Sequence, residues 1–215
     1  NMDWKWWNTP RWFTNTSFSH LQKFGKTDLG FSAFIMTDEG YRRLNGENMG
    51  RMTIKLKHFS NRFEGLYYGV NVNTGATYKT DFILWENAVT GALKQSEMTA
   101  AKFRGNFITV DPFISLHKKD RYRHDFKIRF RSDRNTLPEN KQNNSDAVNI
   151  YSEYQLWYRI NGFLDLTSGL TENYSQVNSE FFGDHYGFNF AGFSQLEIRP
   201  SERLKAVAGL RLEHF

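Results

Sequence analysis

Charged residues occupy alternate positions in the segment 121–131, where they are well placed to meet a polar solute. Guanidinium and ammonium groups bind carboxylates or phosphates, and carboxylates pair with cations on a neighbouring strand. Later segments carry further charged residues that are expected on the same face. Together, these charges form either a solute path or an internally paired network. Internal pairing is the simpler expectation for each residue. The set comprises Arg123, Asp125, Lys127, Arg129, Glu153, Arg159 and Glu197.

A second candidate set combines arginine, aromatic and acidic residues in or near polar segments that should be loops. Arginine binds anions through paired N–H groups, and aromatic rings attract cations. Loops on a rigid scaffold commonly carry recognition residues, so this set suits an anionic, ring-bearing ligand. Packing within the loops is the alternative for each residue. The set comprises Arg42, Arg43, Tyr78, Trp85 and Glu86.

The sequence offers little for catalysis or metal binding. Asp184 and His185 form the one acidic–histidine pair of interest, and a solvated surface explains that pair equally well. The six histidines lack the short spacing of a metal site, and cysteine is absent. We therefore predict no catalytic residue, no metal and no cofactor, in a protein that is not an enzyme.

The charges in 121–131 belong to a pattern with a period of two, which predicts β-strands. Tyr122, Phe126, Ile128 and Phe130 alternate with them, giving one apolar and one charged face. The contrast recurs along the chain and predicts about ten strands. They are expected at 12–24, 28–37, 50–59, 64–74, 101–117, 121–132, 147–160, 163–174, 187–199 and 202–214.

The length of these alternating runs indicates an antiparallel transmembrane β-barrel, of which this all-β chain is a portion. Soluble strands usually have about 5–6 residues, whereas a tilted strand that crosses a bilayer needs about 9–11. A membrane barrel also turns its apolar residues outward and its polar residues toward the lumen. The alternative, a soluble sandwich or lipocalin-like barrel, would turn Phe126, Ile128 and Phe130 toward a dry centre.

The predicted strands are joined alternately by short turns and long loops, as in outer-membrane barrels. Asn161–Gly162 predicts a tight hairpin, because both residues tolerate positive φ. Pro112 lacks an amide hydrogen and predicts an irregularity in its strand. Tyr122, Trp157 and Tyr158 are expected in an aromatic belt at the periplasmic interface. Long extracellular loops are expected at 38–49, 75–100, 133–146 and 175–186.

Composition fits this interpretation and limits others. The chain has 215 residues, a formal net charge of +5 and 17% aromatic residues, with a mean hydropathy of −0.65. Low hydropathy is compatible with a membrane barrel, since half of each strand is polar. Its positive charge is spread over many strands rather than gathered in one patch, so we do not expect nucleic-acid binding.

Several motifs resemble the barrel of TonB-dependent outer-membrane receptors of Bacteroidetes-type bacteria, in the same order along nearly the whole chain. The resemblance implies one part of a larger barrel over residues 1–215, with the plug domain and the remaining strands absent. A start without a signal peptide and the parity of Phe215 also suggest a fragment. The motifs lie at 16–20, 28–30, 38–42, 82–88, 111–114, 190–197 and 208–213.

The resemblance implies a receptor in the bacterial outer membrane that imports a scarce nutrient, with a ferric siderophore or other metal chelate as the leading ligand. Its expected partners are outer-membrane lipid, this small-molecule ligand, and the TonB complex through the absent N-terminal part. The charged set above would then face the lumen. The alternative is a complete small barrel of ten strands that acts as a surface protease or adhesin.

Overall fold

The computed structural model describes residues 9–42, 44–82, 84–87, 89, 95–119, 121–201 and 203–215. They form a single antiparallel sheet of ten strands, together with the short 3-10 helices η1 (Glu97–Thr99) and η2 (Lys141–Asn143). The strands are β1 (Phe13–Phe24), β2 (Thr27–Asp38), β3 (Glu47–Phe59), β4 (Leu66–Phe82), β5 (Ala100–Lys118), β6 (Tyr122–Thr136), β7 (Ser145–Asn161), β8 (Leu164–Ser179), β9 (His185–Ser201) and β10 (Leu204–His214).

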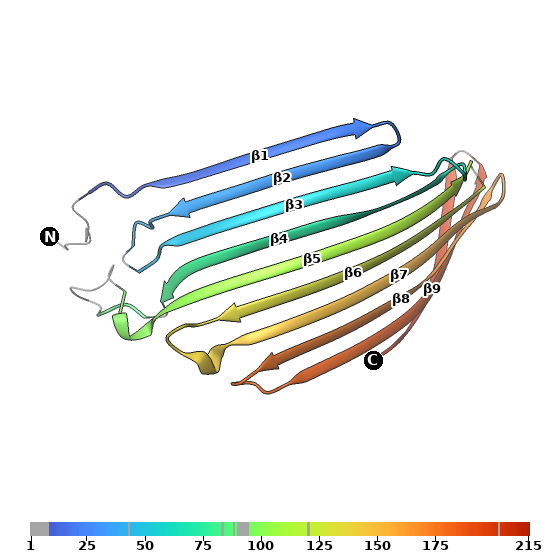
Figure 1. Cartoon of the computed structure of the whole chain (residues 1–215). Coiled ribbons are helices and arrows are strands. Elements are labelled where there is room, and N and C mark those ends of the chain that lie inside the picture. Colours follow the sequence, from blue (N-terminus) through green and yellow to red (C-terminus); the bar gives the residue numbers. More distant parts are fainter. Residues whose placement is uncertain are drawn as a thin grey trace.

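The strands follow one another in the sheet in the order of the sequence, from β1 to β10 (Figure 1). Each pair of neighbours is antiparallel, so the chain runs as a simple meander with turns at one end and loops at the other. Among the described residues, β1 has a hydrogen-bonded neighbour only in β2, and β10 only in β9. The all-β class and the predicted strand number are confirmed.

The register separates the side chains into an apolar face and a polar face, because directly opposed residues point to the same side of a sheet. One row of the apolar face crosses five strands, and every side chain in it is hydrophobic. The strands extend this contrast over successive rows, as the alternation in the sequence predicts. The row consists of Ile54, Val72, Val110, Phe130 and Ile150.

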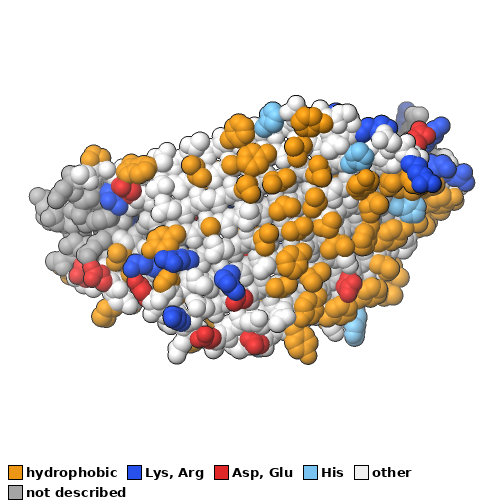
Figure 2. Space-filling model, viewed as in Figure 1, with side chains coloured by type: hydrophobic (Ala, Val, Ile, Leu, Met, Phe, Trp, Pro, Cys, Tyr) orange, Lys and Arg blue, Asp and Glu red, His pale blue; other side chains and the backbone are white. Residues whose placement is uncertain are grey.

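Burial in this sheet is the reverse of burial in a soluble protein. Ala191 is the one described hydrophobic residue that is buried, whereas Phe126 and Phe130 are 40% and 38% exposed. The other buried side chains are polar or charged, including Ser115 and Asp125. Hydrophobic residues gather on the visible face in Figure 2, over the half nearest the short turns. The described residues thus form no dry centre, contrary to what the soluble alternative predicts.

Within the hydrophobic part of the apolar face, the described residues include an acidic exception. Glu172 lies opposite Ser152 on β7 and Phe190 on β9, and Ser152 in turn lies opposite Ile128. The Ser152 hydroxyl donates a hydrogen bond of 3.4 Å to Glu172 Oε2. The parity of Glu172 with Leu170 in the sequence already places it on this face.

The turns at one end of the sheet are shorter than most loops at the other, but the loops themselves are shorter than predicted. Strands β4, β6 and β8 continue to Phe82, Thr136 and Ser179, well into the segments expected to be loops. These extensions are rich in polar residues, and those of β6 and β8 carry little alternation. Backbone pairing does not depend on apolar side chains, which explains why the strands continue beyond the alternating region.

The two local expectations, the hairpin at Asn161–Gly162 and the strand irregularity at Pro112, are both present, but their details differ from a positive-φ turn and from a bulge. The hairpin at 161–164 is present, but Gly162 does not have positive φ; Asn161 Oδ1 instead accepts a hydrogen bond of 3.0 Å from the Phe163 amide. Pro112 causes no bulge, because Val110 and Phe113 pair with β6 in the same register. The β5–β6 pairing is interrupted only at Asp111 and Pro112, since proline has no amide hydrogen to donate.

No helix among the described residues is both long and apolar enough to cross a bilayer.

Candidate functional site

The polar face of the sheet brings together all the charged residues that the alternation assigned to one surface. Lys127 lies opposite Glu153, and Asp125 lies beside Ser115, so these side chains point to the same side. Arg159 and Glu197 are both opposite Asp165. Parity therefore identified the shared face correctly. It could not identify partners, which depend on strand register.

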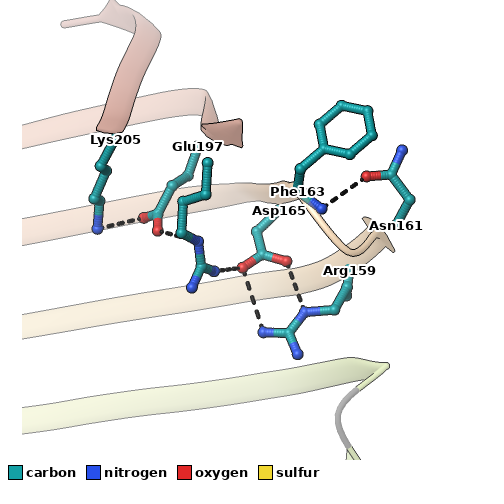
Figure 3. A network of polar contacts seen from close by, with 7 residues as sticks. Arg159, Asn161, Phe163, Asp165, Glu197 and Lys205 are labelled. Atoms are coloured by element: carbon teal, nitrogen blue, oxygen red, sulfur yellow. Dashed lines mark hydrogen bonds and ion pairs between the residues drawn. The ribbon is translucent and has the colours of Figure 1, made fainter. Parts of the chain in front are cut away.

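The largest network on this face joins four strands near the short turns (Figure 3). Arg159 Nε lies 3.0 Å from Asp165 Oδ1, and Arg199 also donates to this carboxylate. Arg199 Nε lies 3.0 Å from Glu197 Oε1, and Lys205 Nζ lies 2.8 Å from Glu197 Oε2. Three cations thus share two carboxylates across β7, β8, β9 and β10. Asp165 is 4% exposed, so its charge depends on these partners.

A second network surrounds Asp125, which is also 4% exposed. Ser115 donates a hydrogen bond of 2.6 Å to Asp125 Oδ1, and Arg123 donates to the other carboxylate oxygen. His117 Nε2 lies 4.0 Å from Asp125 Oδ1 and 3.3 Å from the Tyr67 hydroxyl. These contacts link β4, β5 and β6 at the level of the short turns.

A third network lies nearer the middle of the strands. Arg129 binds Asp111 with two parallel hydrogen bonds of 2.8 and 2.9 Å. Lys127 Nζ is 3.7 Å from Glu153, which also accepts a hydrogen bond of 2.7 Å from the Tyr151 hydroxyl. Every charged residue of the predicted set therefore has an oppositely charged neighbour. Internal pairing, the simpler of the two expectations, describes this part of the face.

A hollow of about 430 Å³ lies where the pairing between β5 and β6 is interrupted. Asp111 and Arg129 border it, and Tyr67, Asn71 and Phe113 line its β4 and β5 side. Pro112 and Ile128 from the apolar face also contribute, because the strands do not pair at this point. Pro112, which has no amide hydrogen, thus lies both at this interruption and in the lining of the hollow, and that signal was visible in the sequence.

One feature of the polar face was not predicted from the sequence, namely the pairing of phenylalanine with glycine across neighbouring strands. Gly69, Gly75 and Gly169 lie directly opposite Phe113, Phe107 and Phe193. A Cβ atom at Gly169 would lie 2.5 Å from Phe193 Cζ, and the other two glycines are similarly covered by their rings. Each phenyl ring therefore occupies the space that a side chain at the glycine would take. The sequence does show glycine and phenylalanine residues with the parity of the polar face. Which glycine lies opposite which phenylalanine depends on the register between strands, which the sequence does not show.

The structure brings together some of the predicted loop residues and separates others. Arg42 Cζ lies 5.3 Å from the centre of the Trp85 ring and 5.0 Å from that of Tyr41. Glu86 follows Trp85 and is exposed. Tyr78 lies within β4 rather than in a loop, on the apolar-face side beside Arg104. Arg43 lies outside the described residues.

Other predicted features are placed as follows. Tyr122 and Tyr158 are opposite each other on the apolar face, as a belt requires. Trp157 is on the polar face instead, because it has the opposite parity and lies 5.1 Å from Arg159 Cζ. His185 Nε2 contacts the Phe182 carbonyl at 2.8 Å. No cluster of potential metal ligands occurs among the described residues.

Comparison with known proteins does not assign the chain to a family. No protein-family model matches the sequence, and no curated protein matches it.

Proposed function

We propose that this chain is part of the wall of an outer-membrane β-barrel that belongs to a TonB-dependent receptor. The observation that carries the proposal is the reversed burial of the sheet, with exposed hydrophobic residues on one face and buried charges on the other. In water, such an apolar surface would be unfavourable at about 25 cal/mol per Å². Against hydrocarbon tails the same surface is compatible with its surroundings, while the polar face lines a wet interior.

The height of the apolar band agrees with a bilayer. On β6 it extends from Tyr122 to Phe130. At about 3.3 Å per residue and a tilt of roughly 40°, this length corresponds to about 20 Å, comparable to the ~25 Å apolar band of known membrane barrels. Tyr122 lies at the turn end of the band, where amphipathic rings favour the headgroup level.

The edges of the sheet also favour a larger barrel over a small one. In lipid, each unpaired backbone group of β1 or β10 costs several kcal/mol, so both edges need partners. A complete barrel of ten strands would pair β1 with β10, whereas each has a single neighbour among the described residues. Further strands between the two edges would satisfy both. A surface protease or adhesin of ten strands is therefore the weaker candidate.

We propose import of a scarce nutrient as the activity, with a ferric siderophore or other metal chelate as the leading ligand. Support comes from the resemblance of the motifs and from Arg42 and Trp85, which lie together at the loop end of the sheet. The ion-paired polar face would act as a rigid wall, and the energy would come from the TonB complex.

Location and ligand need separate experiments. Fractionation of cells that produce the full-length protein should recover it in the outer membrane, extractable only with detergent. Recovery in the soluble fraction would overturn the membrane assignment. Ferric chelates should bind the purified receptor, and deletion of its gene should slow growth under iron starvation. If neither effect occurs, the ligand is not an iron chelate.

A further inference from the structure

We propose that the polar face carries a binding site for a small planar polyanion, at the hollow between β4, β5 and β6 that Lys55 and Lys57 of β3 flank. The hollow of about 430 Å³ lies within the range of small-molecule sites, roughly 300–1,000 Å³. A folded domain or a long peptide would cover the face without entering a space of this size.

The two lysines have no carboxylate partner among the described residues, whereas Lys127 and Arg129 on β6 are each ion-paired. Lys55 lies opposite Gly30 on one side and Asn71 on the other, neither of which is charged. Lys57 lies opposite Asp28, but the two form no ion pair. Its ammonium group lies instead 4.1 Å from the centre of the Tyr67 ring, which also lines the hollow.

Cations lie on both sides of the hollow. Lys55 and Lys57 are on β3, and Lys127 and Arg129 are three strands away on β6. Two carboxylates line the hollow and both are ion-paired, Asp111 with Arg129 and Asp125 with Arg123. An anion with carboxylates on opposite edges can therefore approach both pairs of cations at once. Such multivalent contact favours a polyanion over a single carboxylate or phosphate.

An aromatic ring from β5 forms part of the hollow between these cations. Gly69 pairs with Phe113, and a Cβ atom at Gly69 would lie 2.8 Å from Phe113 Cζ, so the phenyl ring covers the glycine. A planar ligand can stack on this ring.

This inference depends on the proposed function in one respect, because a solute reaches the polar face only if that face borders a path through the membrane. Binding is measured separately from membrane location, so the two can fail independently. A receptor that fractionates in the outer membrane but fails to bind the probe removes the inference alone. A soluble protein removes the proposed function.

The test measures binding of trimesate, a planar benzene tricarboxylate, to the full-length receptor in detergent by calorimetry. Substitution of both lysines, Lys55→Gln with Lys57→Gln, should weaken binding about tenfold, because exposed charge pairs contribute modestly. Raising the salt from about 50 mM to about 500 mM should weaken wild-type binding as well. Lys205→Gln is the matched control, since Lys205 is ion-paired on the same face far from the hollow, and it should change affinity less than twofold.

A second comparison tests the aromatic floor. Wild-type receptor should bind trimesate more tightly than its saturated counterpart, cyclohexane tricarboxylate, and Phe113→Leu should reduce this preference to less than about twofold. Absence of trimesate binding, or equal losses in the lysine double variant and Lys205→Gln, overturns the proposal. A third result would also overturn the proposal: the wild type binds no trimesate, and the lysine double variant is less stable than the wild type. The lysines would then bind an acidic polypeptide segment instead of a small ligand.

Discussion

Asp165 illustrates at the scale of a residue how the polar face accommodates buried charge. Its carboxylate is almost inaccessible to solvent, but Arg159 and Arg199 approach it from two neighbouring strands. A buried carboxylate without partners would be strongly unfavourable, whereas one held by two guanidinium groups is tolerated. The arrangement fixes the relative positions of β7, β8 and β9 near their turns.

Replacing this carboxylate should weaken the barrel wall. Asp165→Asn leaves both arginines without their shared anion, and we expect a loss of about 2 kcal/mol in unfolding free energy, because the arginines are partly exposed. Urea unfolding of the full-length protein in lipid vesicles measures it. Asp184→Asn, in an exposed loop, is the control. An unchanged Asp165→Asn variant would mean that the network contributes no stability.

Glu172 gives the opposite expectation, because it lies on the apolar face. If hydrocarbon covers this face, the carboxylate is unfavourable there, and Glu172→Leu should stabilise the protein by about 1 kcal/mol. The same unfolding assay applies, with Glu153→Leu on the polar face as the contrast that should destabilise. A loss of stability in Glu172→Leu would indicate that this carboxylate has a partner outside the described residues.

At the scale of an element, the glycine–phenylalanine pairs determine how closely neighbouring strands pack on the polar face. Phe193 lies over Gly169, and Tyr154 from the strand on the other side approaches with its carbonyl oxygen. Both atoms are within 2.5 Å of where a Cβ atom would be. A side chain at this position would therefore have to displace both the ring and the backbone.

Gly169→Ala should accordingly destabilise the protein by about 1–3 kcal/mol, the usual cost of overpacking. Gly192→Ala is the matched control on the adjacent strand, because its added methyl group meets only the end of the Leu170 side chain at 3.4 Å. We expect the control to remain within about 0.5 kcal/mol of wild type. Similar losses in the two variants would contradict close packing at Gly169.

The sequence predicted the strands well at their turn ends and poorly at their loop ends. β1 ends at Phe24 and β3 at Phe59, as expected, because apolar alternation there meets a turn signal. β4 continues to Phe82 through a segment in which Ala76, Tyr78 and Phe82 keep the apolar-face parity, but its Gly, Thr, Lys and Asp content favoured a loop. For the site, parity placed Asp125 on the correct face, but its contact with Ser115 depends on a register that a single sequence does not encode visibly.

For the whole molecule, the central question is which medium covers the apolar face. Phe126 is 40% exposed on this face and lies midway between Tyr122 and Phe130, whereas Gln155 on the neighbouring strand belongs to the polar face. In water, a lysine at an exposed position is close to neutral. Near the middle of a bilayer, it costs about 2–4 kcal/mol. The two media therefore predict different results for the same substitution.

Phe126→Lys should reduce the fraction of full-length protein that folds into lipid vesicles, by about 2–4 kcal/mol in unfolding free energy. Gln155→Lys should be close to wild type, because the polar face is wet. Heat-modifiable migration on gels measures the folded fraction of a barrel. Normal folding of Phe126→Lys would place water, not lipid, against this face.

The continuation of the strands past the apolar band has a consequence for access to the cell surface. From Thr74 to the end of β4 at Phe82, the pairing with β5 is unbroken, and about 20 Å of stiff sheet results at roughly 3.3 Å per residue with strand tilt. If the apolar band of the sheet lies in the hydrocarbon of the membrane, this strand extension places the loops beyond the sugar layer of the outer leaflet. Approaching molecules would then meet Arg42 and Trp85 in open solution rather than among lipid headgroups.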